Sequence, residues 1–200
     1  MKKPVKLKRI LLVGLVVGIA VLSTLLSSDN PPASAVSLDI PPETEAIMES
    51  PGVIHSKPTR LLIPTLSIDA DIAHVGLTSD GDMEAPEKLS DAGWYQYGSH
   101  PGDEGNAVIA GHVGGLKTPG VFANLHKLQI GEHFSVVDEQ GQNVHFTVMK
   151  IKTYAQDDRP DEVFRSKAGQ HLNLITCTGA WNEQGQTYAD RLVVFADKTD

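Results

Sequence analysis

The chain has almost no cysteine: Cys177 is the only one among its 200 residues. A single thiol cannot form an intramolecular disulfide, so the fold must be stable without one. In an oxidising compartment a thiol is either paired or kept free for chemistry, and Cys177 has no partner to pair with. Apolar and β-branched residues lead up to it from Leu174, and Thr178-Gly179 follows. We therefore expect the thiol where a buried strand ends and a loop begins.

Basic charge is scarce after the first nine residues. Five Lys and Arg precede the first acid, Asp29, which leaves 12 basic residues against 25 acidic ones and a net charge of −13 after residue 28. Binding to phosphate groups needs a basic surface. The charge therefore argues against nucleic acid as a partner.

The common metal and nucleotide motifs are also missing. The chain has no HExxH and no second cysteine, and His126, His133 and His145 are spaced like ordinary strand and loop residues. It has no GxxxxGK(S/T) and no glycine-rich turn that would cradle a phosphate. One acidic stretch offers calcium ligands, although a solvated loop is the simpler interpretation: Asp157, Asp158, Asp161 and Glu162. We expect no metal and no cofactor.

The first 58 residues carry the signals of an exported, anchored protein. Residues 10–26 are uncharged and reach about 25 Å as a helix, the short end of what crosses a bilayer. Basic residues precede this run, which predicts a cytoplasmic N-terminus and an extracellular remainder. We expect a cytoplasmic segment at 1–9, a transmembrane signal-anchor at 10–28, a proline-rich extracellular linker at 29–58 and the folded domain at 59–200. A cleaved signal peptide is the alternative, because Ala33-Ser34-Ala35 resembles a cleavage site.

The folded part consists of many short strands with little helix. One or two helical turns are expected at 121–128 and a short helix at 161–165. Apolar or alternating segments predict strands at 61–64, 66–72, 107–110, 133–137, 144–151, 172–177 and 191–196. This pattern predicts a mainly β, closed or nearly closed barrel, with functional residues on the loops and strand ends of one rim.

Three reactive side chains occupy such strand ends: His112, Cys177 and Arg191. A thiolate is the nucleophile, and a free thiol with a pKa of about 8.5 needs a neighbouring base or cation to ionise at neutral pH. His112 can take the proton and later protonate a leaving amine, and Arg191 can stabilise a negatively charged carbonyl oxygen. Together they predict acyl transfer through a thioester; the alternative is a buried, inert thiol in a non-catalytic cell-surface adhesion domain. Trp94 lies in a Trp-Tyr cluster typical of packing and is also a candidate for substrate contact.

Three motifs at these positions resemble the sortases, the cysteine transpeptidases of Gram-positive cell surfaces. They are AGH at 110–112, LITC at 174–177 and RLVVFA at 191–196, in the order, spacing and strand context of that family. The likeness covers about residues 60–196. Within the family, several segments are most similar to class F. In that class we expect Gly-Gly after the cysteine, where this chain has Thr178-Gly179, so classes A, D and E stay open.

The resemblance implies an eight-stranded sortase-type barrel with His112, Cys177 and Arg191 as its catalytic trio. It further implies that Cys177 attacks the Thr–Gly carbonyl of an LPXTG-like C-terminal sorting signal on a surface protein. An amine of a cell-wall precursor then resolves the thioester, with slow hydrolysis as a side reaction. Thr176 is implied to position the substrate, and the loop at 153–170 to shape its groove. A pilin-polymerising sortase of another class is the remaining alternative.

Overall fold

The computed structural model describes residues 55–115, 117–165, 168–184 and 187–199. The segments expected at 1–9 and 10–28, and most of the linker expected at 29–58, lie outside these residues. Within the described part of the chain, no helix is long and apolar enough to span a membrane. Packing begins before residue 59, because His55 is buried and both its backbone N–H and its Nδ1 meet Asp103 Oδ1, at 3.0 and 2.8 Å.

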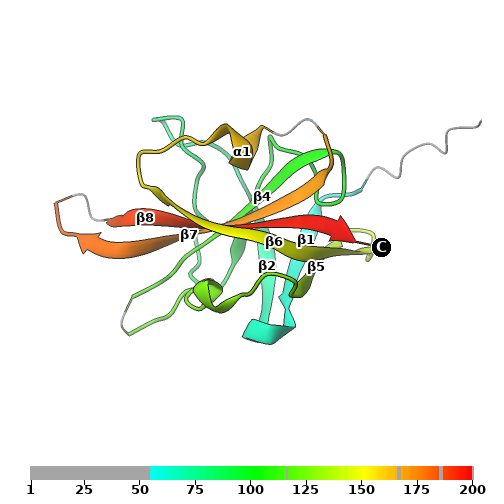
Figure 1. Ribbon diagram of the computed structural model, residues 1–200, viewed down its shortest axis with the longest axis horizontal. Coiled ribbons are helices and arrows are strands. Elements are labelled where there is room, and N and C mark those ends of the chain that lie inside the picture. The colour runs from blue at the N-terminus through cyan, green and yellow to red at the C-terminus, as the bar shows by residue number, and fades with distance from the viewer. Residues whose placement is uncertain (1–54, 116, 166–167, 185–186, 200) are drawn as a thin grey trace, which may run out of the picture. The chain divides into compact units, whose positions relative to one another are not determined.

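In the described part of the chain, eight strands close into a barrel in the order β1-β2-β3-β4-β7-β8-β6-β5 (Figure 1). Three short helical elements accompany them: η1 (Pro64–Leu66), η2 (Leu125–Lys127) and α1 (Asp161–Phe164). The strands are β1 (Pro58–Ile63), β2 (Ile68–Val75), β3 (Ala92–Tyr95), β4 (Gly105–Gly111), β5 (His133–Asp138), β6 (Asn143–Ala155), β7 (Gln170–Asn182) and β8 (Thr187–Thr199). The predicted mainly β barrel with few short helices is confirmed.

Apolar side chains from alternate strand positions fill the barrel interior. Ala107 and Ile109 of β4 belong to the core cluster, as does Leu172 of the neighbouring β7. Phe134 of β5 and Phe146 of β6 stack in the same cluster with ring centroids 5.7 Å apart. Burying one such side chain stabilises the fold by about 1.5–3 kcal/mol, so the core supplies the stability that a chain with one cysteine cannot draw from a disulfide.

The outer face of β4 and β7 is covered as well. Asn106, which precedes the core residue Ala107, and Asn173, which lies between the core residues 172 and 174, are only 4% and 1% exposed. The segment between β6 and β7, which contains α1, crosses this face (Figure 1). Val163 of α1 packs there with Tyr154 and Val193. α1, within the β6–β7 segment, is therefore part of the packed structure.

Several expected boundaries need correction. β7 does not end at Cys177 but continues to Asn182, and β8 begins at Thr187 before Arg191, so a paired hairpin replaces much of the loop expected after Cys177. No alternating pattern marks β3 in the sequence. The helical turns expected at 121–128 are limited to η2, in which Leu125 is buried.

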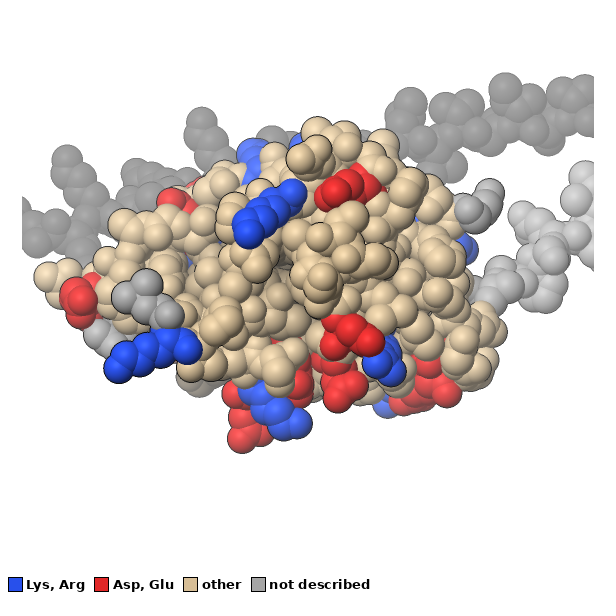
Figure 2. Space-filling view, turned by 90° about the horizontal axis from the view of Figure 1, so that it is seen from below, with Lys and Arg blue, Asp and Glu red and all other residues tan. Residues whose placement is uncertain are grey.

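Basic side chains do not gather on the face of the molecule drawn in Figure 2. On the face drawn in Figure 2, Lys and Arg side chains lie singly, most of them near Asp or Glu, and they form no broad basic patch there. A nucleic-acid surface would need such a patch.

Candidate active site

Three adjacent strands bring the predicted reactive residues together. β7 lies between β4, to which it is parallel, and β8, to which it is antiparallel. Cys177 of β7 stands opposite Arg191 of β8 in the antiparallel register. In the parallel register Ala110 of β4 pairs with Ile175, so His112, two residues further along, comes level with Cys177. Strand pairing thus unites residues that are distant in sequence.

His112, Cys177 and Arg191 line one open cavity of about 300 Å³. All three side chains are partly exposed. The cavity walls come from residues 82–85, between β2 and β3, and from residues 154–160, 163 and 164, at the end of β6 and in the segment after it. Arg159 and Asp82 form an ion pair that joins these two walls. The reactive residues therefore sit in a recess with walls that a peptide can contact.

A second hollow, of about 260 Å³, meets the first at the same two side chains. His112 and Cys177 line both hollows, whereas Arg191 lines only the first. The other side chains that shape the second hollow are mostly apolar or aromatic: Leu89, Val113, Trp181, Thr187 and Tyr188. The thiol can thus be approached from two sides.

Backbone contacts hold His112 in place. Its Nε2 lies 2.7 Å from Pro86 O. A carbonyl oxygen only accepts, so Nε2 donates here, and in the neutral ring Nδ1 is then the nitrogen able to take a proton. The following loop folds back onto the same residue: Phe122 N donates to His112 O at 2.9 Å, and a Cβ on Gly120 would lie 2.2 Å from that oxygen. Gly120 is therefore required for this close approach.

The chain bends directly after Cys177. Cys177 is a free, half-buried cysteine, and the strand pairing becomes irregular between Thr178 and Trp181. Gly179 has a φ of +83°, and a Cβ there would lie 2.4 Å from Asp190 Oδ2. Glycine adopts this left-handed backbone without strain. The Thr178-Gly179 pair thus keeps glycine where the backbone requires it.

The guanidinium of Arg191 is fixed by its own strand. Nη1 donates to Tyr188 O and to Asp190 O, both at 2.9 Å, and Nη2 donates to Thr187 Oγ1 at 3.2 Å. A guanidinium has five N–H donors, so these three bonds orient the group without exhausting its donors.

The two candidate substrate-binding residues differ in their surroundings. Thr176 lines the cavity but is only 4% exposed, and its Oγ1 donates to Gly111 O at 2.8 Å, which ties β7 to β4 beside the reactive residues. Trp94 is 2% exposed, donates from Nε1 to Ser99 O at 3.1 Å and lines neither hollow. The predicted substrate contact of Trp94 is therefore corrected to a packing role, because its indole is enclosed by the core.

Some residues of the site carry no signal in the sequence. Pro86 contributes only a backbone carbonyl, and Phe164 reaches the cavity only because the β6–β7 segment crosses the barrel. Neither feature has a motif that sequence reasoning could find. Across the described ranges, no group of three or more His, Cys, Asp and Glu side chains is placed to hold a metal ion.

Comparison with protein families matches residues 61–199 to the sortase domain. Among similar solved structures, the complex of Streptococcus agalactiae sortase C1 and MTSET is 24% identical, with 71% of this chain and 68% of that chain covered and a TM-score of 0.57. Sortase C-1 from Actinomyces oris is 25% identical, with 71% and 73% covered and a TM-score of 0.57. A lid mutant of sortase A from Corynebacterium diphtheriae is 22% identical, with 72% and 70% covered and a TM-score of 0.57. A search of curated proteins finds no match.

The family match spans the strands that carry all three motifs, and the closed barrel is shared with the similar structures. The chain therefore belongs to the sortase family and is a cysteine transpeptidase.

Proposed function

We propose that Cys177 is the nucleophile, that His112 is the general acid and base, and that Arg191 stabilises the charge on the substrate's carbonyl oxygen. The observation that carries this proposal is the meeting of all three side chains at one cavity. Partial exposure of Cys177 supports it, because an attacking thiol must reach its substrate. The hydrogen bond from His112 Nε2 to Pro86 O supports it too, because it leaves Nδ1 as the basic nitrogen.

The reaction is an acyl transfer in two steps. Sγ of Cys177 gives its proton to His112 and attacks the carbonyl carbon of the scissile peptide bond. The C–N bond breaks, His112 returns the proton to the leaving amine, and the acyl half stays on Cys177 as a thioester. A second amine then attacks the thioester, its proton passes to His112, and the C–S bond breaks to restore the thiolate. Arg191 stabilises the oxyanion in both steps.

We infer that the two hollows bind different parts of the substrates, the acyl half in one and the amine in the other. The thioester keeps the acyl half in the cavity that Arg191 lines. The leaving amine and the incoming amine take the same place at the carbonyl carbon, because the second step is the reverse of the first with a different amine. We assign the amine side to the second hollow, which opens at His112 and Cys177. Trp181 and Tyr188 then pack against the chain that carries the amine.

The substrate class follows from the motifs. We propose that the donor is a surface protein with an LPXTG-like C-terminal sorting signal, cleaved between Thr and Gly, and that the acceptor is an amine of a cell-wall precursor. The basic residues before the uncharged run support a single membrane anchor at 10–28, with the N-terminus cytoplasmic and the domain extracellular. Class F is the subclass that we predict.

Thioester trapping tests the catalytic assignment. The protein is mixed with an LPXTG peptide, and intact-mass spectrometry detects the acyl adduct while chromatography follows cleavage. Cys177→Ala abolishes both signals, and His112→Ala or Arg191→Ala lowers kcat at least about a hundredfold. His126→Ala, an exposed histidine outside both hollows, is the matched control and retains activity. Turnover by the Cys177→Ala protein would refute the assignment.

A panel of acceptors tests the second step. Glycine oligopeptides, a cell-wall stem peptide and a lysine-bearing pilin peptide compete with water for the same thioester. Preference for the wall peptides supports cell-wall attachment, whereas preference for the pilin lysine would indicate a pilin-polymerising sortase.

A further inference from the structure

The β6–β7 segment forms a wall of the catalytic cavity through α1. Val163 and Phe164 of α1 line that cavity. A helix of four residues is too short to be stable by itself. The position of this wall therefore depends on contacts between α1 and the strands around it.

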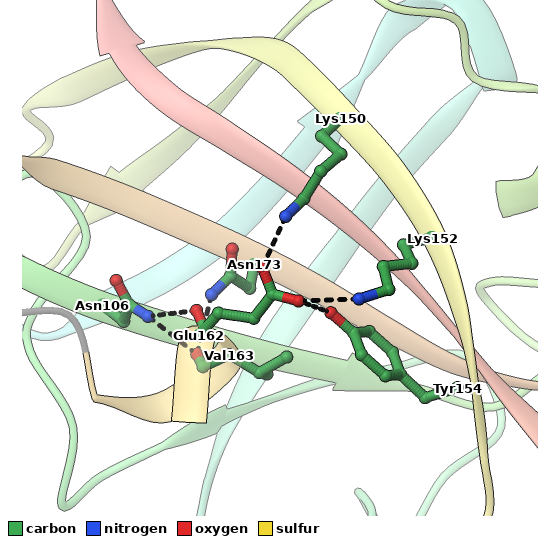
Figure 3. A network of polar contacts seen from close by, with 7 residues as sticks. All are labelled: Asn106, Lys150, Lys152, Tyr154, Glu162, Val163 and Asn173. Carbon is green, nitrogen blue, oxygen red and sulfur yellow. Dashed lines mark hydrogen bonds and ion pairs between the residues drawn. The ribbon is translucent and has the colours of Figure 1, made fainter. Parts of the chain in front are cut away.

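Two buried asparagines hold α1 from the barrel side (Figure 3). Asn106 Nδ2, from β4, donates to Glu162 O at 2.9 Å and to Val163 O at 3.0 Å. Asn173 Nδ2, from β7, donates to Val163 O at 2.7 Å. The last carbonyls of a helix have no partners within it, and here the two amides supply them. Two of the three strands at the site, β4 and β7, thus bind the same end of α1.

The barrel itself does not need polar side chains at these positions. Asn106 and Asn173 are almost fully buried, and their Oδ1 atoms have no hydrogen-bond partner among the described residues. A buried acceptor without a partner destabilises the fold, so apolar residues at these two positions of the covered sheet face would make the barrel more stable. What asparagine adds is the Nδ2 donor, and the Nδ2 groups of both residues donate to carbonyls of α1.

The opposite side of α1 is held by charged groups on β6 (Figure 3). The carboxylate of Glu162 accepts from Lys150 Nζ at 2.6 Å, from Lys152 Nζ at 3.0 Å and from the Tyr154 hydroxyl. Lys150, Tyr154 and Lys152 lower the pKa of Glu162 to about 2, so this second anchor is charged at any working pH.

We propose that Asn106 and Asn173 are positioning residues for the sorting-signal peptide, which fix α1 so that the cavity wall is formed before the peptide binds. The inference rests on the proposed function. When a tether is lost, α1 leaves its place in a fraction of the molecules, and the apparent affinity falls with the competent fraction. Chemistry at Cys177 is unchanged once the peptide is bound. A lost tether therefore raises KM and leaves kcat unchanged.

Asn173→Asp is the first test, with an LPXTG peptide as substrate. A carboxylate cannot donate to Val163 O, so KM rises about tenfold near neutral pH, while kcat stays within about twofold. Burial raises the pKa of the new carboxyl, and its protonation restores one donor, so the ratio of variant to wild-type KM falls toward one at about pH 5. Measuring the wild type at each pH accounts for the charged groups around position 173: Lys150, Asp161, Glu162, Arg165, His171 and Asp197.

Asn143→Asp is the matched control, because Asn143 is exposed at the start of β6 and carries the same change of charge away from α1. Its KM stays at the wild-type value. A purely structural defect in Asn173→Asp would lower the active fraction and the melting temperature without a pH-dependent KM ratio.

Hydrogen exchange tests the tether without a substrate. Backbone amides of residues 157–165 exchange faster in Asn106→Asp and Asn173→Asp than in the wild type or in Asn143→Asp. If these buried variants do not fold, Glu162→Ala loosens α1 from its exposed side and raises KM about threefold.

Unchanged KM and unchanged exchange in a folded Asn173→Asp protein would overturn the inference. So would a fall in kcat at constant KM. A wild-type protein that does not turn over the peptide refutes the proposed function alone. Hydrogen exchange then decides whether Asn106 and Asn173 hold α1 in place.

Discussion

Replacing Thr176 with valine separates a structural role from a substrate-binding role for its hydroxyl group. Valine keeps the shape of threonine but removes Oγ1, which donates to Gly111 O at 2.8 Å. Both residues are buried, so the carbonyl of Gly111 loses this donor in a place that water does not readily reach. Losing the bond and leaving the acceptor without this donor destabilises the fold by about 1–3 kcal/mol.

Urea unfolding measures this loss, and steady-state kinetics measure its effect on catalysis. Thr176→Val lowers the unfolding midpoint at constant m-value. Because the lost bond ties the strand of Cys177 to the residue before His112, we expect kcat to fall and KM to change little. Thr176→Ser is the control: it keeps the hydroxyl, loses about 0.8 kcal/mol with its methyl group and retains kcat. A valine variant of wild-type stability with a raised KM would refute this reasoning and assign the hydroxyl to the substrate.

Two further predictions concern the amine side and the α1 anchor. Trp181→Ala, which opens the wall of the second hollow, raises several-fold both the KM for the acceptor amine and the KM for the donor peptide, because the incoming and leaving amines take the same place, and it leaves hydrolysis of the thioester unchanged; an equal loss in hydrolysis contradicts the assignment of the amine side. Glu162 has a folded-state pKa of about 2 against an ordinary value of 4.5, so its stabilising contribution is present above about pH 4.5 and is lost as the pH falls through 2. The difference in melting temperature between the wild type and Glu162→Gln therefore shrinks over that interval, and a constant difference would show that the anchor does not contribute through ionisation.

The three side chains that line the cavity and that we propose as reactive can be picked out in the sequence because each has a local signal. Cys177 is the only cysteine, and His112 and Arg191 flank apolar runs within short motifs. The hairpin after Cys177 was not predictable in the same way. Its residues are polar and irregular, and they are strands only because β7 and β8 pair with each other beyond the core. Alternation of apolar and polar residues predicts a strand with one buried face. It gives no prediction for a hairpin that extends into solvent, because neither face of such a hairpin is buried.

Local alternation and short motifs are enough to predict the mainly β character, the family and the three side chains that we propose as reactive, because each is a local property of the chain. The enclosure of Trp94 in the core, and the placement of Asn106 and Asn173 against the carbonyls of α1, become visible only once the chain is folded. These outcomes depend on which strands become neighbours. β4 and β7 pair in parallel across a long stretch of chain, and no local pattern specifies that register.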